Sequence, residues 1–256
     1  MNRIKVWVWV RIKVWVWVGV MMVLLGSAGG VMGQKVFEQD TIKTTSGDLV
    51  ITSIGHGSLL FKFQDRNFYI DPVMQIADYS LLPKADVILV THDHGDHLDP
   101  VAIENISKPE TEIFLTKLCF DKLKKGKVCE NGSYFIAAGV PVETVAAYNI
   151  VAVRGNGKPY HAKGEGNGYV LAFGPLKVYV AGDTELTPEM AKLKGIDIAF
   201  LPIGLPYTME PAMAANAAKI LKLKILYPYH FNNSNPEEVV RALIGSPTEV
   251  RVRLLK

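Results

Sequence analysis

Cysteine is nearly absent from this chain of 256 residues, which contains only Cys119 and Cys129. Two cysteines are too few for a disulfide-rich scaffold or a four-cysteine zinc site. In an exported protein they could form a single disulfide, and two free thiols are the alternative. Since 49% of the residues are hydrophobic and 21% are charged, an apolar core must stabilise the chain, and the length suffices for one large domain.

An excess of basic charge is missing beyond the first 33 residues. These contain four basic and no acidic residues, whereas the rest of the chain has 24 Lys and Arg against 25 Asp and Glu. The formal net charge of +3 therefore comes from the N-terminal segment. A balanced charge gives no case for nucleic-acid binding, and the oligomeric state cannot be read from it.

The N-terminal segment has the order of a signal peptide, because residues 1–33 begin with basic residues and continue with an uncharged apolar stretch. Small residues follow at 26–30, so cleavage is expected near Ala28. The apolar stretch is about as long as a membrane span, roughly 20 residues. A membrane anchor at residues 14–32, with contact to the bilayer, is therefore the alternative to cleavage. Either interpretation predicts export to the periplasm or the cell exterior.

Histidine is also scarce, with six residues in the chain, yet three of them lie in one hexapeptide. The run from His92 to His97 has the pattern H-x-H-x-D-H and follows the apolar residues 85–90, which predict a buried strand. Imidazole nitrogens and carboxylate oxygens are ligands for zinc and similar divalent metals. A solvated polar loop is the alternative, but the density of ligands favours a metal-binding loop at a strand end, where α/β folds usually place their chemistry.

Three more residues with metal-binding side chains lie at or near the ends of predicted strands: His161, Asp183 and His230. Singly, an isolated histidine is more often a core or surface residue, and an aspartate after a strand more often caps a turn. In combination with the hexapeptide they complete a set of ligands large enough for two metals.

The pattern of apolar runs and turn signals predicts strands, then strand–helix units, and then the same order again. Strands are expected at residues 49–54, 58–63, 67–70, 85–90, 112–116, 134–138, 142–147, 169–173, 177–181, 196–201, 225–227 and 250–254. Helices are expected at residues 100–106, 116–125, 210–223 and 236–244, with a short helix after Thr187. This order predicts a four-layer α/β/β/α sandwich at residues 48–256, preceded by a polar linker at residues 34–47.

The order of the ligands resembles the metallo-β-lactamase superfamily. The shorter runs G-H-G-S-L-L from Gly55, Y-I-D-P from Tyr69, G-N-G-Y-V from Gly166 and L-P-I-G from Leu201 are similar to one branch of it. That branch contains L-ascorbate-6-phosphate lactonase and related metal-dependent hydrolases. The resemblance extends over roughly residues 48–255 and implies the metallo-β-lactamase fold and a metal-dependent hydrolase.

The resemblance also implies a site for two divalent cations, with zinc expected first and manganese or iron as alternatives. It implies His92, His94 and His161 as ligands of one cation, Asp96, His97 and His230 as ligands of the other, and Asp183 as the bridge. A hydroxide shared by the two metals would attack an ester, lactone or phosphodiester bond of a small molecule, and Asp96 would orient that water and later carry a proton. Histidine rather than glutamate at His94 disfavours oxygen-reducing di-iron chemistry, and aspartate rather than cysteine at Asp183 disfavours hydrolysis of β-lactam antibiotics.

Three further residues are expected near this site. His56 stands between two glycines and is interpreted as a buried structural residue or as a contact to ligands or substrate. Asp71 is expected to hydrogen-bond the ligand loop or to cap a turn, and Tyr207 to line the pocket. Two other functions stay open: a membrane-associated, phospholipase-D-like phosphodiesterase and a non-catalytic metal-binding domain. The presence of all seven ligands counts against the non-catalytic alternative.

Overall fold

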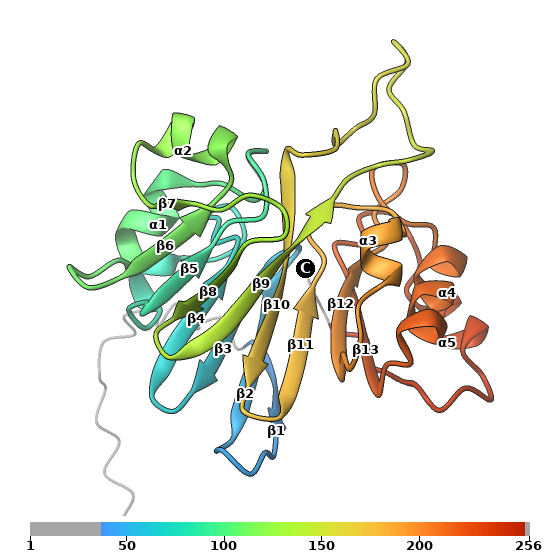
Figure 1. Cartoon of the computed structure of the whole chain (residues 1–256), viewed down its shortest axis with the longest axis horizontal. Coiled ribbons are helices and arrows are strands. Elements are labelled where there is room, and N and C mark those ends of the chain that lie inside the picture. Colours follow the sequence, from blue (N-terminus) through green and yellow to red (C-terminus); the bar gives the residue numbers. More distant parts are fainter. Residues whose placement is uncertain (1–36, 254–256) are drawn as a thin grey trace, which may run out of the picture. The chain divides into compact units, whose positions relative to one another are not determined.

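Two seven-stranded β-sheets face each other in the computed structural model, which describes residues 37–253 (Figure 1). The first sheet has its strands in sequence order: β1 (Glu38–Ile42), β2 (Leu49–Gly55), β3 (Ser58–Phe63), β4 (Arg66–Ile70), β5 (Val87–Leu89), β6 (Glu112–Leu115) and β7 (Lys127–Val128). The second sheet repeats this arrangement with β8 (Tyr134–Ala137), β9 (Val140–Ala147), β10 (Gly166–Phe173), β11 (Leu176–Val180), β12 (Ile198–Pro202), β13 (Ile225–Tyr229) and β14 (Glu249–Val250). In each sheet the first four strands along the chain pair antiparallel and the later ones pair parallel.

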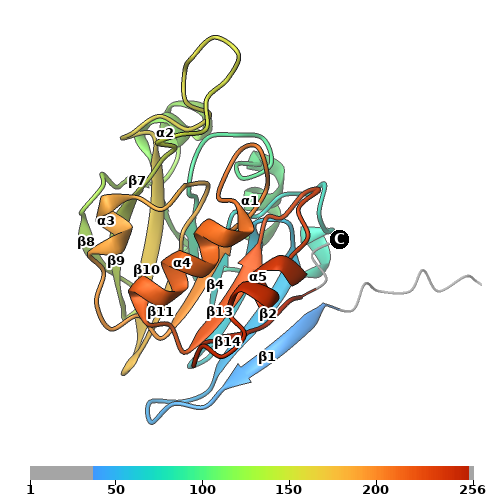
Figure 2. The same ribbon diagram turned by 90° about the vertical axis from the view of Figure 1, so that its right-hand side faces the viewer.

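Helices cover the outer face of each sheet. The first sheet is covered by η1 (Tyr79–Leu81), α1 (Pro100–Ile106) and α2 (Lys117–Leu123), and the second by α3 (Pro188–Ala191), α4 (Pro211–Leu221) and α5 (Glu237–Ala242). Figure 2 shows α4 and α5 in front of the strands of the second sheet. The expected four-layer α/β/β/α sandwich is confirmed.

Three buried hydrophobic clusters separate the four layers. The cluster between the two sheets contains Phe61, Phe173 and Phe200, whose rings meet at centroid distances of 5.7 to 5.9 Å. The alternation of side chains along a strand places these residues on the inner face and sends their neighbours outward to the helices. The sheets are therefore buried on both faces, and the loops at their edges are left to carry polar chemistry.

The helix at Pro100–Ile106 follows the ligand loop directly and begins as the sequence predicts. The Asp99 side chain accepts hydrogen bonds from the backbone N–H groups of Val101 and Ala102, and Pro100 occupies the first helical position. The other carboxylate oxygen of Asp99 accepts from the Met74 N–H at 2.9 Å. One side chain thus ends the ligand loop, starts the helix and connects it to the loop after β4.

The structure corrects the linker expected at residues 34–47. Residues 38–42 of that segment form β1, which pairs antiparallel with β2 from Glu38 opposite Ser53 to Ile42 opposite Leu49. The segment has the polar composition of a linker because β1 is an edge strand with exposed side chains. At the other end, the strand expected at 250–254 is only the two-residue β14, and residues 251–253 are irregular.

Both cysteines are free thiols in the described part of the chain. Cys119 lies in the cluster under α1 and α2, and Cys129 lies in the cluster between the sheets. Burial raises the pKa of each thiol to about 11. Of the two alternatives for the cysteines, the structure contains the pair of free thiols, and both are buried.

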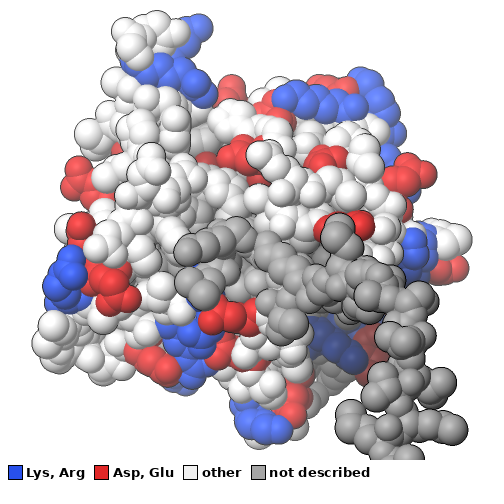
Figure 3. All heavy atoms as spheres, turned by 180° about the vertical axis from the view of Figure 1, so that it is seen from behind, with Lys and Arg blue, Asp and Glu red and all other residues white. Residues whose placement is uncertain are grey.

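Charged side chains of both signs are mixed on the surface. Figure 3 shows Lys and Arg side chains interspersed with Asp and Glu on one face of the molecule. Several of these charges form ion pairs, such as Lys127 with Glu112 and Lys224 with Asp197. This arrangement agrees with the balanced charge of the sequence.

Asp86 is a buried carboxylate away from the ligand loops that pairs with two cations, and we expect its loss to destabilise the first sheet. Its carboxylate accepts from Arg66 at 3.0 Å, from Lys108 at 2.8 Å and from the Asn67 N–H at 2.8 Å, with only 7% of the side chain exposed. Asp86→Asn should lower the free energy of unfolding at pH 7 by about 1.5–3 kcal/mol, the range for hydrogen bonds to a charged group. Urea unfolding of both proteins measures this.

The effect of Asp86→Asn should depend on pH. Burial opposes the charge of Asp86, but Lys108, the Asn67 N–H and Arg66 together lower its pKa below the usual value. A lowered carboxyl pKa contributes stability above the pKa of the unfolded chain, about 3.9, and that contribution is lost as the pH falls through the folded-state pKa. The difference between the two proteins should therefore shrink toward pH 3. A difference that stays constant between pH 7 and pH 3 would contradict an ionic role.

Candidate metal centre

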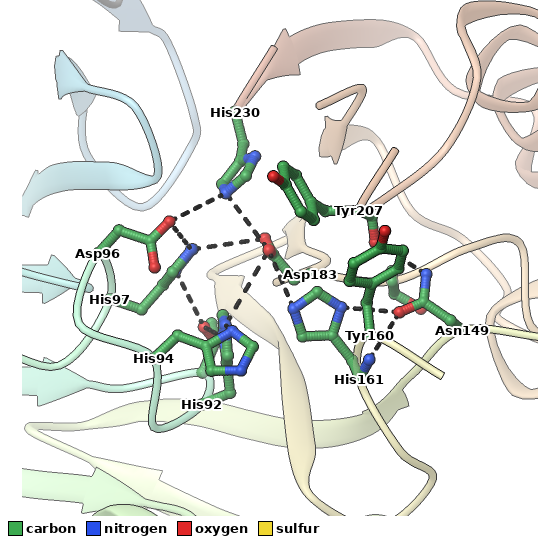
Figure 4. A network of polar contacts seen from close by, with 12 residues as sticks. His92, His94, Asp96, His97, Asn149, Tyr160, His161, Asp183, Tyr207 and His230 are labelled. Carbon is green, nitrogen blue, oxygen red and sulfur yellow. Dashed lines mark hydrogen bonds and ion pairs between the residues drawn. The ribbon is translucent and has the colours of Figure 1, made fainter. Parts of the chain in front are cut away.

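All six histidines of the chain and two aspartates meet at one edge of the paired sheets. Figure 4 labels both aspartates and all of these histidines except His56. The hexapeptide follows β5, Asp183 follows β11, and His230 follows β13. His56 lies in the tight turn between β2 and β3, and His161 lies in the long loop between β9 and β10. The carboxyl ends of parallel strands lie at the same sheet edge, so residues far apart in sequence become neighbours there.

Asp183 lies at the centre of this cluster. Its Oδ2 atom is 3.3 Å from His161 Nε2, 3.3 Å from His230 Nε2 and 4.0 Å from His92 Nε2. Its Oδ1 atom is 3.5 Å from His97 Nε2. Figure 4 shows these imidazoles pointing at the carboxylate from several sides. One side chain thus faces the ligands of both groups that the sequence predicts.

The remaining donors divide into two groups around Asp183. In one group, ligand atoms of His92, His94 and His161 lie within 4.8 Å of one another. In the other, the same holds for His56, Asp96, His97 and His230. The first group corresponds to the first expected ligand set, and the second contains the other expected set with His56 added.

His56 contacts the second group directly. Its Nε2 atom is 3.0 Å from Asp96 Oδ2, its ring centroid is 3.9 Å from that of His230, and its backbone oxygen accepts from the His230 N–H at 3.2 Å. The sequence left a buried structural role and a contact to ligands or substrate as alternatives. In the structure His56 is a contact of two candidate ligands.

Asp71 supports the hexapeptide from beneath. Its carboxylate accepts from the Thr91 N–H at 2.8 Å and the Thr91 hydroxyl at 2.6 Å, and lies 2.7 Å from His97 Nδ1. This contact directs Nε2 of His97 toward Asp183. A carboxylate on the far nitrogen of a ligating histidine fixes its tautomer and raises its basicity. The sequence left a hydrogen bond to the ligand loop and the capping of a turn as alternatives for Asp71. In the structure Asp71 accepts hydrogen bonds from Thr91 of the ligand loop.

Asn149 orients His161 as Asp71 orients His97, through a contact to Nδ1 of the ring. Its Oδ1 atom is 2.8 Å from both Nδ1 and the backbone nitrogen of His161. Its Nδ2 donates to the backbone oxygen of Tyr207 at 2.8 Å. This link joins the loop that carries His161 to the loop that carries Tyr207. The partner role of Asn149 could not be read from the sequence, because an asparagine twelve residues before a histidine has no local signature.

Three residues of the site have a strained backbone. His56, Asp71 and His230 have φ angles of 48°, 46° and 48°. Residues other than glycine rarely adopt such positive values, and each such residue costs about 1–3 kcal/mol. Contacts of the surrounding structure, such as the hydrogen bonds from Thr91 to Asp71 and from the His230 N–H to the His56 backbone oxygen, hold these residues in this conformation.

The charges of the cluster are strongly coupled. Burial disfavours the ionised form of Asp183, but the imidazoles, His230 and His97 first, hold its pKa well below the usual value. Burial would lower the pKa of His97, but the carboxylates of Asp183 and Asp71 raise it to about 9. Burial and the nearby His97 hold the pKa of His92 well below its usual value. A cation that binds here therefore meets ionised carboxylates and must displace the proton of His97.

Several buried atoms at the centre have no hydrogen-bond partner among the described residues. They are His97 Nε2, Asp183 Oδ1, and both ring nitrogens of His230. An unsatisfied buried polar atom costs about 1–3 kcal/mol. Imidazole nitrogens and carboxylate oxygens aimed at a common centre are the donor set for zinc and related divalent metals. The residues present therefore fit a metal, which would satisfy His97 Nε2, Asp183 Oδ1 and the ring nitrogen of His230 that faces the two aspartates, Nε2.

A cavity of about 450 Å³ opens over the cluster. Tyr207, which the sequence placed at the pocket, lines it and packs edge-on against Tyr160 at 5.0 Å between ring centroids. The lining consists of His94, Gly95, Asp96, Arg154, Tyr160, His161, Asp183, Tyr207, His230 and Asn232. The volume suits a small molecule, since sites for such ligands measure about 300–1,000 Å³.

The described residues resemble known hydrolases in sequence and in structure. The profile of the beta-lactamase superfamily domain matches residues 50–230. A UPF0173 metal-dependent hydrolase of Enterococcus faecalis is 33% identical over 213 residues, 75% of this chain and 92% of the relative. Another from Nanoarchaeum equitans is 32% identical over 188 residues, 71% of this chain and 83% of the relative. The crystal structure of a metal-dependent hydrolase from Parabacteroides distasonis is 47% identical, with a TM-score of 0.82 over 86% of this chain and 100% of that chain.

The names of these relatives state that they are metal-dependent hydrolases but name no substrate. The similarity to the L-ascorbate-6-phosphate lactonase branch therefore stays an expectation. The non-catalytic metal-binding alternative is set aside, because the relatives are hydrolases.

The comparisons contradict the expected signal peptide and export. The sequence relatives include proteins of archaea and of Gram-positive bacteria, and nothing in their similarity to this chain supports a periplasmic or extracellular location. Residues 1–33, on which the expectation rested, lie outside the described residues. Between residues 37 and 253, no helix is long and apolar enough to cross a bilayer. The expected signal peptide, anchor and exported location are thus not supported by the relatives, nor is the membrane contact that favoured a phospholipase-D-like enzyme.

Proposed function

Because this chain belongs to the beta-lactamase superfamily and is a metal-dependent hydrolase, we propose that it cleaves an ester, lactone or phosphodiester bond of a small molecule. The observation that carries the proposal is the convergence of two groups of donors on Asp183. We propose two divalent cations at this centre, zinc first and manganese or iron as alternatives. His92, His94 and His161 would hold one, Asp96, His97 and His230 the other, and Asp183 both.

Two cations held there would polarise the scissile carbonyl or phosphoryl group and lower the pKa of a water from about 15.7 toward 7. The chain's own residues must then position this water and handle its proton. Asp96 suits both tasks, since its side chain lines the cavity and is 48% exposed. Although burial opposes its charge, His230, His56 and His97 hold its pKa below the usual value, so that it stays an acceptor at neutral pH. We therefore propose Asp96 as the residue that orients the water and carries the proton.

His56 would position Asp96 for this task. The two side chains are 3.0 Å apart between Nε2 and Oδ2, so His56 restricts the rotation of the carboxylate. Tyr207 and Tyr160 form an aromatic wall of the cavity. The substrate would lie between this wall and Asp183.

Metal loading tests the centre, and a substrate panel tests the reaction. We expect the purified chain, after loading with zinc or manganese and removal of excess, to retain close to two cations per chain by mass spectrometric metal analysis. The loaded chain should hydrolyse at least one class in a panel of esters, lactones and phosphodiesters, and chelation should abolish that activity. A chain that retains no cation from excess zinc or manganese would contradict the proposed centre.

Asp93→Asn is the matched control for metal loading. Asp93 is a carboxylate of the same hexapeptide, but it pairs with Lys122 at 2.6 Å and belongs to neither donor group. Its replacement should leave the metal content unchanged, whereas Asp96→Asn should lower it. Equal metal content in the two variants would exclude Asp96 from the ligands.

A further inference from the structure

The cavity over the metal centre contains one cationic side chain, Arg154, that neither the ligand set nor the proposed mechanism uses. The acidic residues of the lining are Asp96 and Asp183, and both belong to the candidate metal ligands. Arg154 is therefore the residue through which the pocket could select a substrate by charge.

Arg154 belongs to a small ordered hairpin. Val153 and Pro159 form an antiparallel bridge, the Arg154 N–H donates to the Lys158 oxygen at 2.7 Å, and the Gly157 N–H donates to the Arg154 oxygen at 2.8 Å. These contacts define the backbone of Arg154. The hairpin belongs to the long segment between β9 and β10 that protrudes in Figure 1.

The base of the hairpin is held by a buried carboxylate. Glu185, 3% exposed, accepts from the N–H groups of Ile150, Val151 and Ala152 at 2.6, 2.7 and 2.9 Å. Glu185 lies two residues after Asp183, so one short loop carries the proposed bridging ligand and holds the hairpin. The position of Arg154 is thereby tied to that of the metal centre.

The guanidinium of Arg154 is oriented by Tyr160. Its Nη2 donates to the backbone oxygen of Tyr160 at 3.1 Å, and its Cζ lies 5.0 Å from the centre of the Tyr160 ring. A guanidinium has five N–H donors, and within residues 37–253 no carboxylate lies within ion-pair distance of this one. Most of its donors thus remain for a ligand, and the stacking limits the entropy lost when one binds.

We propose that Arg154 binds an anionic group of the substrate, a carboxylate or a phosphate, and so makes the pocket selective for anionic small molecules. A guanidinium offers parallel N–H donors that match both kinds of oxyanion. The charge would fix the substrate at the hairpin, with its scissile bond over Asp183. This inference deepens the proposed hydrolytic function and rests on it for the position of the scissile bond.

Binding of two anionic probes to the zinc-loaded chain tests the inference without turnover. Glutarate supplies the carboxylate and glycerol 3-phosphate the phosphate, and calorimetry measures their affinities for the wild type, Arg154→Gln and Arg154→Lys. Arg154→Gln should weaken binding of at least one probe by about 10- to 100-fold, the effect of losing a charge-assisted hydrogen bond. Arg154→Lys should have an intermediate affinity, because it keeps the charge and loses the paired donors. The probe that is affected identifies the class of anion.

Lys158→Gln is the matched control. Lys158 is a cation of the same hairpin, exposed and outside the lining of the cavity, so its removal should leave both affinities unchanged. Equal affinities of wild type and Arg154→Gln for both probes would overturn the inference, as would a wild type that binds neither probe. An equal loss of affinity in Lys158→Gln would also overturn the inference, because any cation of the hairpin would then have the same effect as Arg154.

Turnover separates this inference from the proposed function. If the chain hydrolyses esters, Arg154→Gln should raise KM for mono-(p-nitrophenyl) glutarate. It should leave KM for p-nitrophenyl acetate unchanged, because that ester has no anionic group. If no ester, lactone or phosphodiester is cleaved while probe binding still depends on Arg154, the proposed reaction is wrong and the anion site stands. Equal KM values of wild type and variant for the glutarate ester would count against Arg154 as a selector of carboxylates.

Discussion

Replacing Asp183 by alanine is expected to abolish hydrolysis and to release at least one of the proposed cations. Four imidazoles lie within 4.0 Å of its carboxylate, and they belong to both donor groups. Among the described residues, the two nearby carboxylates have other contacts, because Asp96 is already a member of one group and Asp71 contacts the far nitrogen of His97. The loss of a shared ligand removes the arrangement that activates the water, so the remaining rate should be below detection.

The metal content and the rate of Asp183→Ala should be measured beside those of His56→Ala. His56 contacts Asp96 and His230 but lies outside the expected ligand set, and loss of such a supporting contact typically costs about 10–100-fold. Circular dichroism must first show that both variants are folded. If Asp183→Ala keeps turnover close to that of the wild type while His56→Ala is inactive, the ligand assignment is wrong. His56, which belongs to one of the donor groups, would then take the place of Asp183.

The sequence predicted the convergence of several donors because these donors follow apolar runs. Such a run becomes a buried strand, and the next polar residue lies at the edge of the sheet. His92, Asp183 and His230 are of this kind, at the ends of β5, β11 and β13. Their mutual distances follow from parallel strand pairing, so the order of elements sufficed to bring them together.

The supporting contacts could not be predicted in the same way. Glu185 accepts from the Ile150 N–H across 35 residues of chain, and Asn149 reaches the Tyr207 oxygen across 58. These contacts form between loops whose paths depend on the whole fold, and no local sequence pattern marks either residue as a partner of the other loop. Arg154 was missed for the same reason, because only the folded hairpin brings it to the cavity.

The edge strand β1 was missed for a different reason. A central strand must bury both faces and is therefore apolar, whereas β1 pairs with a single neighbour and exposes most of its side chains. Its composition is that of a linker, and its backbone hydrogen bonds, which no composition reveals, make it a strand.

Replacing Gly204 by alanine is expected to disrupt the second donor group from outside the ligand set. A Cβ atom at this position would clash with the backbone oxygen of His230 and would lie 2.6 Å from its Nδ1 atom. Real Cβ atoms essentially never approach so closely, and a backbone oxygen cannot rotate away as a flexible side chain can. The His230 backbone is already strained at φ 48° and accepts little further distortion. We therefore expect Gly204→Ala to lower the free energy of unfolding by about 3 kcal/mol, the upper part of the range for overpacking.

The displacement of His230 should also appear in the metal content. Its Nε2 atom lies 3.3 Å from Asp183 and 3.7 Å from Asp96, so a shift of the ring moves it away from both carboxylates at once. Thermal unfolding and metal analysis of Gly204→Ala should be compared with Gly155→Ala, where a Cβ atom would meet no heavy atom within 4 Å. The control should bind metal and unfold like the wild type. If Gly204→Ala does the same, the loop after β13 is free to move, and the close packing of Gly204 on His230 does not hold the donor in place.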